Sequence, residues 1–406
     1  IKQAAELILS GSHVSPQAAL KLGMVDQLVN KEDLLNEASR WILEEGKSEQ
    51  PWDKRGFQIP GGATLNNPKI AKVYQDFSTR VAVETRYNYP APIAALESIF
   101  NGTTVSSFDA ALKIETREFS KLTRGAVARN MMRTLFLNKG ITDRLNKRPA
   151  GIDKFKTSQL AILGHSIESN STGYACALAD IEVFPVSGAS DDNNQKILKY
   201  AEESLEQRIN SGKTSKEKAE SILAKIKTSS DDKLLSEIDV IMIVSKIDSK
   251  VLSEQIAKIG DSTIIAVDTT LMSLADVNAG LSNPGRVVGW HVNHPAAYSQ
   301  AAEIVVQDNT SEETLARILD FTQQLRKTPV IQKESSVLFS QACMFVYLEE
   351  GLQMLSEGIS PALIENAARD AGMQKAPLEL IDEISLPLAY QSMNDKSAGA
   401  ELVKSM

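Results

Sequence analysis

The chain has 406 residues, 42% of them hydrophobic and 24% charged, and it carries a formal net charge of −8. This is the composition of a globular protein of roughly two to four domains, and the lack of a basic stripe excludes a nucleic-acid partner. Two widely spaced cysteines, Cys176 and Cys343, exclude a disulfide framework, and no apolar run reaches the ~20 residues of a transmembrane helix.

The first third of the chain is predicted to be mainly helical. Residues 1–45 contain three short helical patterns, and Ser15 followed by Pro16 marks the start of the second. Residues 46–68 are rich in proline, glycine and polar residues, which is typical of a linker. Apolar residues at helical spacing resume over 69–147.

The periodicity changes around residue 153, where short apolar runs begin to alternate with helical patterns. This alternation predicts a Rossmann-like α/β domain, in which crossover helices connect the strands of a parallel sheet. Pro185 lies inside the second run and is unfavourable in a central strand. The pattern becomes helical again from about residue 334. The five runs are residues 159–163, 181–186, 239–244, 263–267 and 286–290.

The segment LAILGHSIESNSTGYA (160–175) has the order strand, glycine turn, helix that begins a dinucleotide-binding site. Gly164 occupies the first of the three glycine positions, whereas Ser166 and Ser169 occupy the second and third. Ser187 stands where an acidic residue would hold the ribose of the cofactor. The residues therefore leave two interpretations open, an NAD-type site and a purely structural β-α-β unit.

His291 follows the fifth apolar run, and Glu303 opens the next strand-like segment. A histidine that accepts a substrate proton needs a carboxylate on its other ring nitrogen, although spacing alone favours a structural histidine. His294 gives a His-x-x-His spacing without further ligands nearby, so no metal site is expected. The hydroxyl of Thr270, in the turn VDTTLMS, either caps a helix or meets a substrate.

Six segments carry a family resemblance: SGSHVSPQAALKLGMVDQLV, YNYPAPIAAL, RGAVARNMMRTLFLNKG, SGKTSKEKAESILAKI, RVVGWHVNHPA and LEEGLQMLSEGISPALIENAARDAGMQKAPLELIDEI. In this order they resemble the alpha subunits of the fatty-acid β-oxidation multienzyme complex, which join an enoyl-CoA hydratase domain of the crotonase family to a 3-hydroxyacyl-CoA dehydrogenase. The resemblance implies an α/β fold with four parts. These are a crotonase C-terminal remnant (1–45), a linker and helical region (46–152), a Rossmann-like NAD-type domain (153–333) and a truncated helical C-terminal domain (334–406).

The same resemblance assigns roles to individual residues. It implies that His291 is the catalytic base, that Glu303 is its carboxylate partner, and that Thr270 and Gln341 contact the substrate. The turn at Gly164, with its two serines and Ser187, would hold NAD. The chain departs from the family in this turn, where two glycines are replaced, and at Gln341, where the family has an asparagine.

The function implied by the resemblance is the NAD-dependent oxidation of 3-hydroxyacyl-CoA to 3-ketoacyl-CoA. The degenerate glycine loop favours an alternative, a pseudo-dehydrogenase that serves an oxidation complex as a scaffold or an acyl-CoA-binding subunit. The resemblance also implies a homodimer through the helical domain, a thiolase-type beta subunit as partner, and a bacterial cytoplasm or an organellar matrix as the location. The chain is expected to be a fragment, because the catalytic part of a hydratase domain would precede residue 1.

Overall fold

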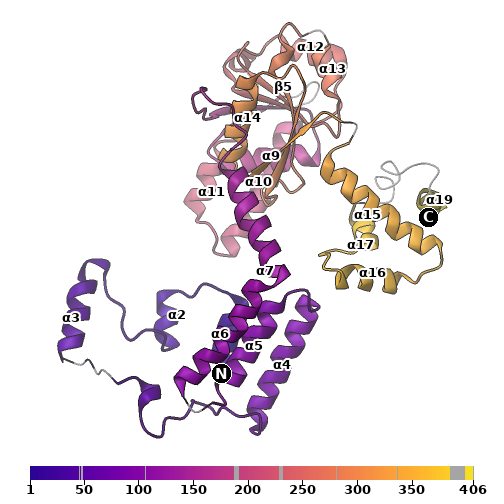
Figure 1. Cartoon of the computed structure of the whole chain (residues 1–406). Coiled ribbons are helices and arrows are strands. Elements are labelled where there is room, and N and C mark those ends of the chain that lie inside the picture. The colour runs from indigo at the N-terminus through magenta and orange to yellow at the C-terminus, as the bar shows by residue number, and fades with distance from the viewer. Residues whose placement is uncertain are drawn as a thin grey trace. The chain divides into compact units, whose positions relative to one another are not determined.

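The computed structural model describes residues 1–44, 46, 49–105, 107–186, 192–227, 232–279, 281–335, 337–384 and 398–405. The chain divides into two compact units (Figure 1). The first unit comprises Ile1–Met132 together with Tyr347–Met406, and the second comprises Arg133–Val346. Each unit is built differently, since the described part of the first contains helices and that of the second is organised around a sheet.

The first unit is an assembly of amphipathic helices. Its helices before residue 133 are α1 (Lys2–Ser10), α2 (Pro16–Lys21), η1 (Lys31–Asp33), α3 (Leu34–Glu44), η2 (Pro51–Asp53), α4 (Pro68–Thr85), α5 (Pro90–Gly102), α6 (Phe108–Arg124) and α7 (Ala126–Met131). The predicted cap of α2 is confirmed, because the Ser15 side chain accepts a hydrogen bond from the Ala18 amide. Phe77 and Phe100 lie in the small core that joins α1, α4 and α5.

The helices after the sheet complete this unit. They are α15 (Phe339–Ser356), which begins in the second unit, α16 (Pro361–Asp370), α17 (Pro377–Ile384) and α19 (Ala398–Ser405). Arg86, just after α4, donates to Asp370 at the end of α16 over 2.5 Å. None of the described helices combines the length and the apolar character needed to cross a membrane.

The second unit contains, in its described residues, a sheet of seven strands in the order β2-β1-β3-β4-β5-β6-β7. All neighbouring strands are parallel except β5 and β6. The strands are β1 (Gln159–Leu163), β2 (Glu182–Val186), β3 (Val240–Ile243), β4 (Ile264–Val267), β5 (Val287–His291), β6 (Ala301–Val306) and β7 (Thr328–Lys333). The five predicted apolar runs are therefore confirmed as parallel strands of a Rossmann-like sheet.

Two features of the sheet differ from what is expected of a fully parallel sheet with crossover helices. β6 runs antiparallel to β5 because the connection over residues 292–300 contains no crossover helix, and a parallel return needs about a dozen residues or more. Pro185 is tolerated in β2 because this strand lies at the edge of the sheet, where a missing amide donor leaves no ladder bond unmade.

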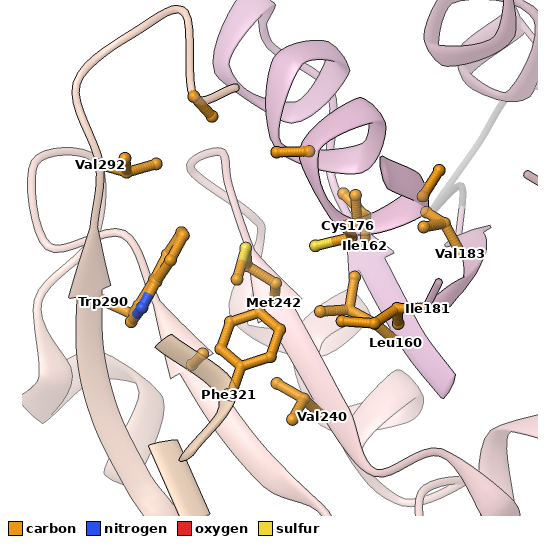
Figure 2. Packing of buried hydrophobic residues seen from close by; sticks show 14 of the residues in the cluster. Leu160, Ile162, Cys176, Ile181, Val183, Val240, Met242, Trp290, Val292 and Phe321 are labelled. Atoms are coloured by element: carbon orange, nitrogen blue, oxygen red, sulfur yellow. The ribbon is translucent and has the colours of Figure 1, made fainter. Parts of the chain in front are cut away.

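Helices cover both faces of the sheet. One face packs against α9 (Ile167–Leu178), α10 (Asp192–Asn210) and α14 (Glu312–Gln324), and Figure 2 shows part of this core, including Trp290 and Phe321. The rings of these two residues lie 5.5 Å apart, and the Trp290 indole donates to Thr322 Oγ1 over 3.0 Å. The other face packs against α12 (Ser249–Ile256) and α13 (Leu274–Asn278). The remaining short helices are η3 (Met132–Asn138), α8 (Lys139–Asp143), α11 (Lys216–Leu223), η4 (Asp232–Glu237) and η5 (Pro284–Arg286).

A buried ion pair fixes the segment that leads into β1. Both oxygens of Asp320, on α14, accept hydrogen bonds of 2.8 Å from the guanidinium of Arg148. Arg148 also donates to the carbonyls of Ile152 and Asp153, and the Phe155 amide donates to Asp320. The pair therefore helps to fix where the chain enters β1, the strand that leads into the glycine turn.

Candidate functional site

The turn after β1 lies where the strand order reverses. The chain proceeds from β1 to β2 on one side and later to β3 on the other, and ligands of open α/β sheets bind outside the carboxyl ends of strands at such a point. Gly164 has φ +101°, a conformation that L side chains rarely adopt. A β-carbon there would lie 2.0 Å from Ser245 Oγ, just beyond β3. The first glycine of the motif is therefore required by the fold.

The two serines in the glycine positions bond to each other. Ser166 is the N-cap of α9, and its hydroxyl accepts from the Ser169 amide over 3.1 Å. The Ser169 hydroxyl accepts in return from the Ser166 amide over 3.1 Å. This capping box satisfies two amides at the helix end, the place where a phosphate would accept hydrogen bonds in a dinucleotide site.

The conformation of the turn and its place in the sheet fit a dinucleotide. The diphosphate of that dinucleotide would be held by Gly164, Ser166 and the first turn of α9. The capping box places two hydroxyls where the glycine motif has open backbone, so the Ser166 and Ser169 amides are already hydrogen-bonded within the chain. Ser187, expected at the ribose, lies outside the described residues.

His291 is the last residue of β5 and faces two carboxylates. Its strand partner in the antiparallel ladder is Glu303 on β6. The carboxylate bonded to its ring is Asp268, directly after β4, where the sequence interpretation expects Glu303. The Nδ1 atom of His291 lies 3.1 Å from Asp268 Oδ1 and 3.2 Å from Oδ2. The exposed fractions of His291, Asp268 and Glu303 are 9%, 5% and 7%, so all three groups are withdrawn from solvent.

Asp268 is itself held in place by Thr270. The Thr270 amide and hydroxyl both donate to Asp268 Oδ1, over 3.0 and 2.8 Å. The hydroxyl that the sequence associates with a helix cap or a substrate is therefore bonded to this carboxylate. α13 is instead capped by Ser273, whose side chain accepts from the Asp276 amide. Thr270 thus belongs to the group of residues around His291.

The charges around His291 determine the direction of its pKa shift. Burial lowers the pKa of the imidazole, but the hydrogen bond and charge of Asp268 raise it, with smaller contributions from a hydrogen bond to Asn293 and from the charge of Glu303. The net effect is a pKa above the usual histidine value. The imidazolium is therefore the form that this environment stabilises.

Glu303 is oriented toward the start of α15. Its Oε1 atom accepts a hydrogen bond of 3.3 Å from the Ser340 amide, and its Oε2 atom is buried without a hydrogen-bond partner. Gln341, the next residue, is partly buried in the first turn of α15. In the described part of the chain, the hydrogen bonds around His291 do not include the Gln341 side chain.

Gly289 allows the turn after β4 to approach β5. A β-carbon on this residue would lie 2.6 Å from Val305 Cβ and 2.8 Å from Thr269 Cγ2. Because Gly289 lies two residues before His291, its side of the strand is also the side of the imidazole. The absence of a side chain here lets Thr269 pack on the strand, and this contact brings Asp268 to the ring.

Replacing Gly289 by alanine is expected to lower the free energy of unfolding of the second unit by about 1–3 kcal/mol, the usual cost of overpacking a core. The added methyl group would displace the turn that carries Asp268, so the pKa of His291 is expected to fall at the same time. Urea denaturation and a histidine NMR titration measure the two effects. An unchanged pKa in a destabilised variant would contradict the link between Gly289 and Asp268.

Sequence reasoning overlooked Asp268, although a signal for it was present. The residue directly follows a buried apolar run, and β4 is the neighbour of β5 in the sheet. Side chains at the carboxyl ends of neighbouring parallel strands lie close together, so an acidic residue there is a candidate partner for His291. His294, by contrast, contacts Ser171 Oγ through Nδ1 over 2.9 Å. Across the described ranges, no group of three or more His, Cys, Asp or Glu side chains is arranged to hold a metal ion.

Two family models match the chain. The model described as "3-hydroxyacyl-CoA dehydrogenase, NAD binding domain" matches residues 159–335, and "3-hydroxyacyl-CoA dehydrogenase, C-terminal domain" matches residues 339–404. Together they account for more than half of the chain. The first match begins at β1 and includes the glycine turn, His291, Asp268 and Glu303.

Curated relatives cover the chain almost from end to end. It is 25% identical over 398 residues to the glyoxysomal fatty acid beta-oxidation multifunctional protein MFP-a of Brassica napus, an alignment that covers 96% of this chain and 54% of the relative. It is 24% identical over 402 residues to the fatty acid oxidation complex subunit alpha of Pseudomonas syringae pv. tomato, covering 98% and 55%. The chain thus spans about half the length of the curated relatives it matches.

Solved structures share the fold of the dehydrogenase part. The (S)-3-hydroxybutyryl-CoA dehydrogenase PaaH1 from Ralstonia eutropha is 24% identical with a TM-score of 0.56, covering 62% of this chain and 93% of that one. FadB2 of M. tuberculosis is 21% identical with the same TM-score, covering 62% and 94%. At these identities the likeness establishes a Rossmann-like α/β domain with a helical C-terminal domain.

Proposed function

Since the chain belongs to the 3-hydroxyacyl-CoA dehydrogenase family, we propose that it oxidises 3-hydroxyacyl-CoA thioesters to 3-ketoacyl-CoA with NAD. One observation carries the proposal: a buried histidine, bonded through one ring nitrogen to a carboxylate, ends the fifth strand of an NAD-type sheet. A group of this kind removes a proton from an alcohol as a hydride departs.

The chemistry requires His291 to be neutral when the substrate binds. Its Nε2 atom would take the proton of the C3 hydroxyl. NAD, held at the turn of Gly164 and Ser166, would supply the oxidant that accepts the hydride from C3. The nearby carboxylates stabilise the imidazolium that forms. Thr270 and Gln341 are proposed to contact the substrate, and Gly164, Ser166, Ser169 and Ser187 are proposed to line the cofactor site.

A second candidate function rests on the capping box at the start of α9. Because Ser166 and Ser169 satisfy each other's amides, fewer donors are left at the helix end for a diphosphate. A chain that has lost NAD binding would act as an acyl-CoA-binding scaffold of an oxidation complex. Both candidate functions include binding of acyl-CoA, and they differ in whether NAD is bound.

Calorimetric titration of the purified chain separates these candidates. NADH is added first alone and then in the presence of acetoacetyl-CoA. The dehydrogenase proposal expects micromolar binding of NADH that is retained with the thioester bound. Binding of acetoacetyl-CoA in the absence of any NADH binding would reject the dehydrogenase and support the scaffold.

Replacing Ser166 by glycine is expected to tighten NADH binding by roughly threefold to tenfold, the equivalent of one additional backbone hydrogen bond of about 1 kcal/mol. The change removes the hydroxyl that accepts from the Ser169 amide, and glycine at an N-cap costs only about a few tenths of a kcal/mol. Ser166→Ala is the matched control, because it keeps a β-carbon at the position. Weaker NADH binding in the glycine variant would mean that the Ser166 hydroxyl itself contacts the phosphate.

The assignments of the region before the dehydrogenase domains and of the partners are also proposals. Residues 1–45 are proposed to be the end of a crotonase-type domain, an assignment supported by the resemblance of SGSHVSPQAALKLGMVDQLV and by relatives whose printed names refer to fatty-acid oxidation. A homodimer through the helical domain is supported by exposed apolar side chains on α15 and α16, among them Val346 and Leu363. A thiolase-type partner rests on the resemblance alone.

A further inference from the structure

One buried histidine and two buried carboxylates lie on or directly beside three neighbouring strands, β4, β5 and β6. Glu303 reaches the site from β6 as the ladder partner of His291, and Asp268 reaches it from the end of β4. Both carboxylates are at least nine-tenths buried. A single proton-accepting imidazole uses one carboxylate on Nδ1, so the two acids have different tasks.

We propose that Asp268, in place of Glu303, is the positioning residue that holds His291 for proton transfer. In this arrangement Asp268 accepts a hydrogen bond from Nδ1–H, which leaves Nε2 as the basic atom that faces the substrate hydroxyl. The inference rests on the proposed dehydrogenase function for its catalytic meaning. The pairing itself is a property of the folded chain.

The geometry of Asp268 suits this task. Both of its oxygens lie within 3.2 Å of Nδ1, so small rotations of the carboxylate keep the contact. Two hydrogen bonds from Thr270 hold Oδ1, and the close packing of Thr269 against Gly289 holds the turn. A carboxylate oriented in this way selects the tautomer of a neutral imidazole, because the proton stays on the nitrogen nearest the acid.

Glu303 has the opposite geometry. Its Oε1 atom accepts a hydrogen bond from the Ser340 amide, and this bond connects β6 to the first turn of α15. Its Oε2 atom has no hydrogen-bond partner. Its charge acts on His291 at a distance, and this is the smallest of the contributions that raise the imidazole pKa. Glu303 is therefore assigned a structural role, which is to connect the sheet to the start of α15.

The pairing has a consequence for the pH dependence of the reaction. The groups that face His291 are the carboxylates of Asp268 and Glu303 and the polar Asn293. A base must be neutral to accept a proton, so oxidation is lost as the pH falls through the raised pKa of His291. Removing the Asp268 charge takes away the largest stabilisation of the imidazolium, so the acidic limb of the pH–rate profile is expected to move to lower pH. Removing the Glu303 charge is expected to move this limb less.

Asp268→Asn and Glu303→Gln, made in the full chain, test the assignment. Asparagine can still accept both hydrogen bonds from Thr270, so the turn is expected to keep its shape. The expected result for Asp268→Asn is a loss of about 10²- to 10⁴-fold in kcat, the range found when a base loses its orienting acid. The acidic limb of the pH–rate profile of this variant is also expected to shift to lower pH. Glu303→Gln is expected to have the smaller effect on both quantities.

Two further variants complete the comparison. Asp268→Glu keeps a carboxylate and is expected to restore part of the rate and of the raised pKa, which a merely structural defect would not do. Asp276→Asn is the matched control, because Asp276 is an exposed acid in the helix after the same turn and is expected to leave rate and pH profile unchanged.

A ¹⁵N NMR titration of the histidine side chains separates failure of this inference from failure of the proposed function. If the unmodified chain does not turn over but the pKa of His291 falls in Asp268→Asn, the dehydrogenase function fails and the pairing stands. If Glu303→Gln lowers that pKa more than Asp268→Asn does, the pairing is overturned and Glu303 is the partner, whatever the rate.

Discussion

Replacing His291 by alanine is expected to lower kcat for the oxidation of 3-hydroxybutyryl-CoA by about 10²- to 10⁴-fold, because a positioned general base contributes a factor of this size. The side chain that accepts the hydroxyl proton is removed, and the buried carboxylates lose the imidazolium that they stabilise. The rate is followed at the absorbance of NADH. The affinity for NADH is expected to stay the same, since His291 acts on the thioester.

His13→Ala serves as the control for this variant. His13 is an exposed histidine of the first unit, so the same substitution there is expected to leave the rate unchanged. A His291→Ala protein that oxidises the substrate at the original rate would remove His291 from the mechanism. A loss of NADH binding in the same variant would assign it to cofactor binding in place of proton transfer.

Replacing Asp320 by alanine is expected to lower the free energy of unfolding of the second unit by about 3–5 kcal/mol, the cost of leaving one member of a buried ion pair without its partner. Arg148 would keep its charge while losing two hydrogen bonds of 2.8 Å, and the Phe155 amide would lose its acceptor. Urea denaturation followed by the fluorescence of Trp290, with Trp41 and Trp52 replaced by phenylalanine, reports on the second unit.

Glu313→Ala is the matched control on the same helix. Glu313 forms an exposed ion pair with Arg317 over 2.6 Å, and its side chain is 61% accessible to solvent. Pairs of this kind contribute about 0–1 kcal/mol, so the control is expected to change the midpoint little. If both variants lost the same stability, burial would not be the reason that the Arg148–Asp320 pair matters.

The Rossmann-like sheet could be predicted because buried parallel strands leave continuous apolar runs in a sequence. Every run chosen on this basis corresponds to one of the strands β1 to β5. β7 was not predicted, because TPVIQK mixes polar residues with a proline, and its edge position makes such a composition acceptable. The strand signal therefore depends on how deeply a strand is buried.

The candidate site could be predicted in part. His291 and Glu303 were identified from a resemblance, and their placement as ladder partners depends on the register of β5 and β6. The bond from His291 to Asp268 depends on the turn after β4, which closes over Gly289 through packing contacts of Thr269. Contacts of this kind come from tertiary packing, which no local pattern records. The capping box of Ser166 and Ser169 is, by contrast, a local contact between residues three apart at a helix start, and the comparison of both positions with glycines leaves it out.

The most direct test of the dehydrogenase function follows one hydrogen atom. The chain is incubated with NAD and with 3-hydroxybutyryl-CoA that carries deuterium at C3, and the nicotinamide product is analysed by mass spectrometry. The function proposed for His291 and the NAD-type sheet expects deuterium in the reduced nicotinamide and an equal amount of 3-ketoacyl-CoA. Binding of both ligands without any transfer of deuterium would contradict it.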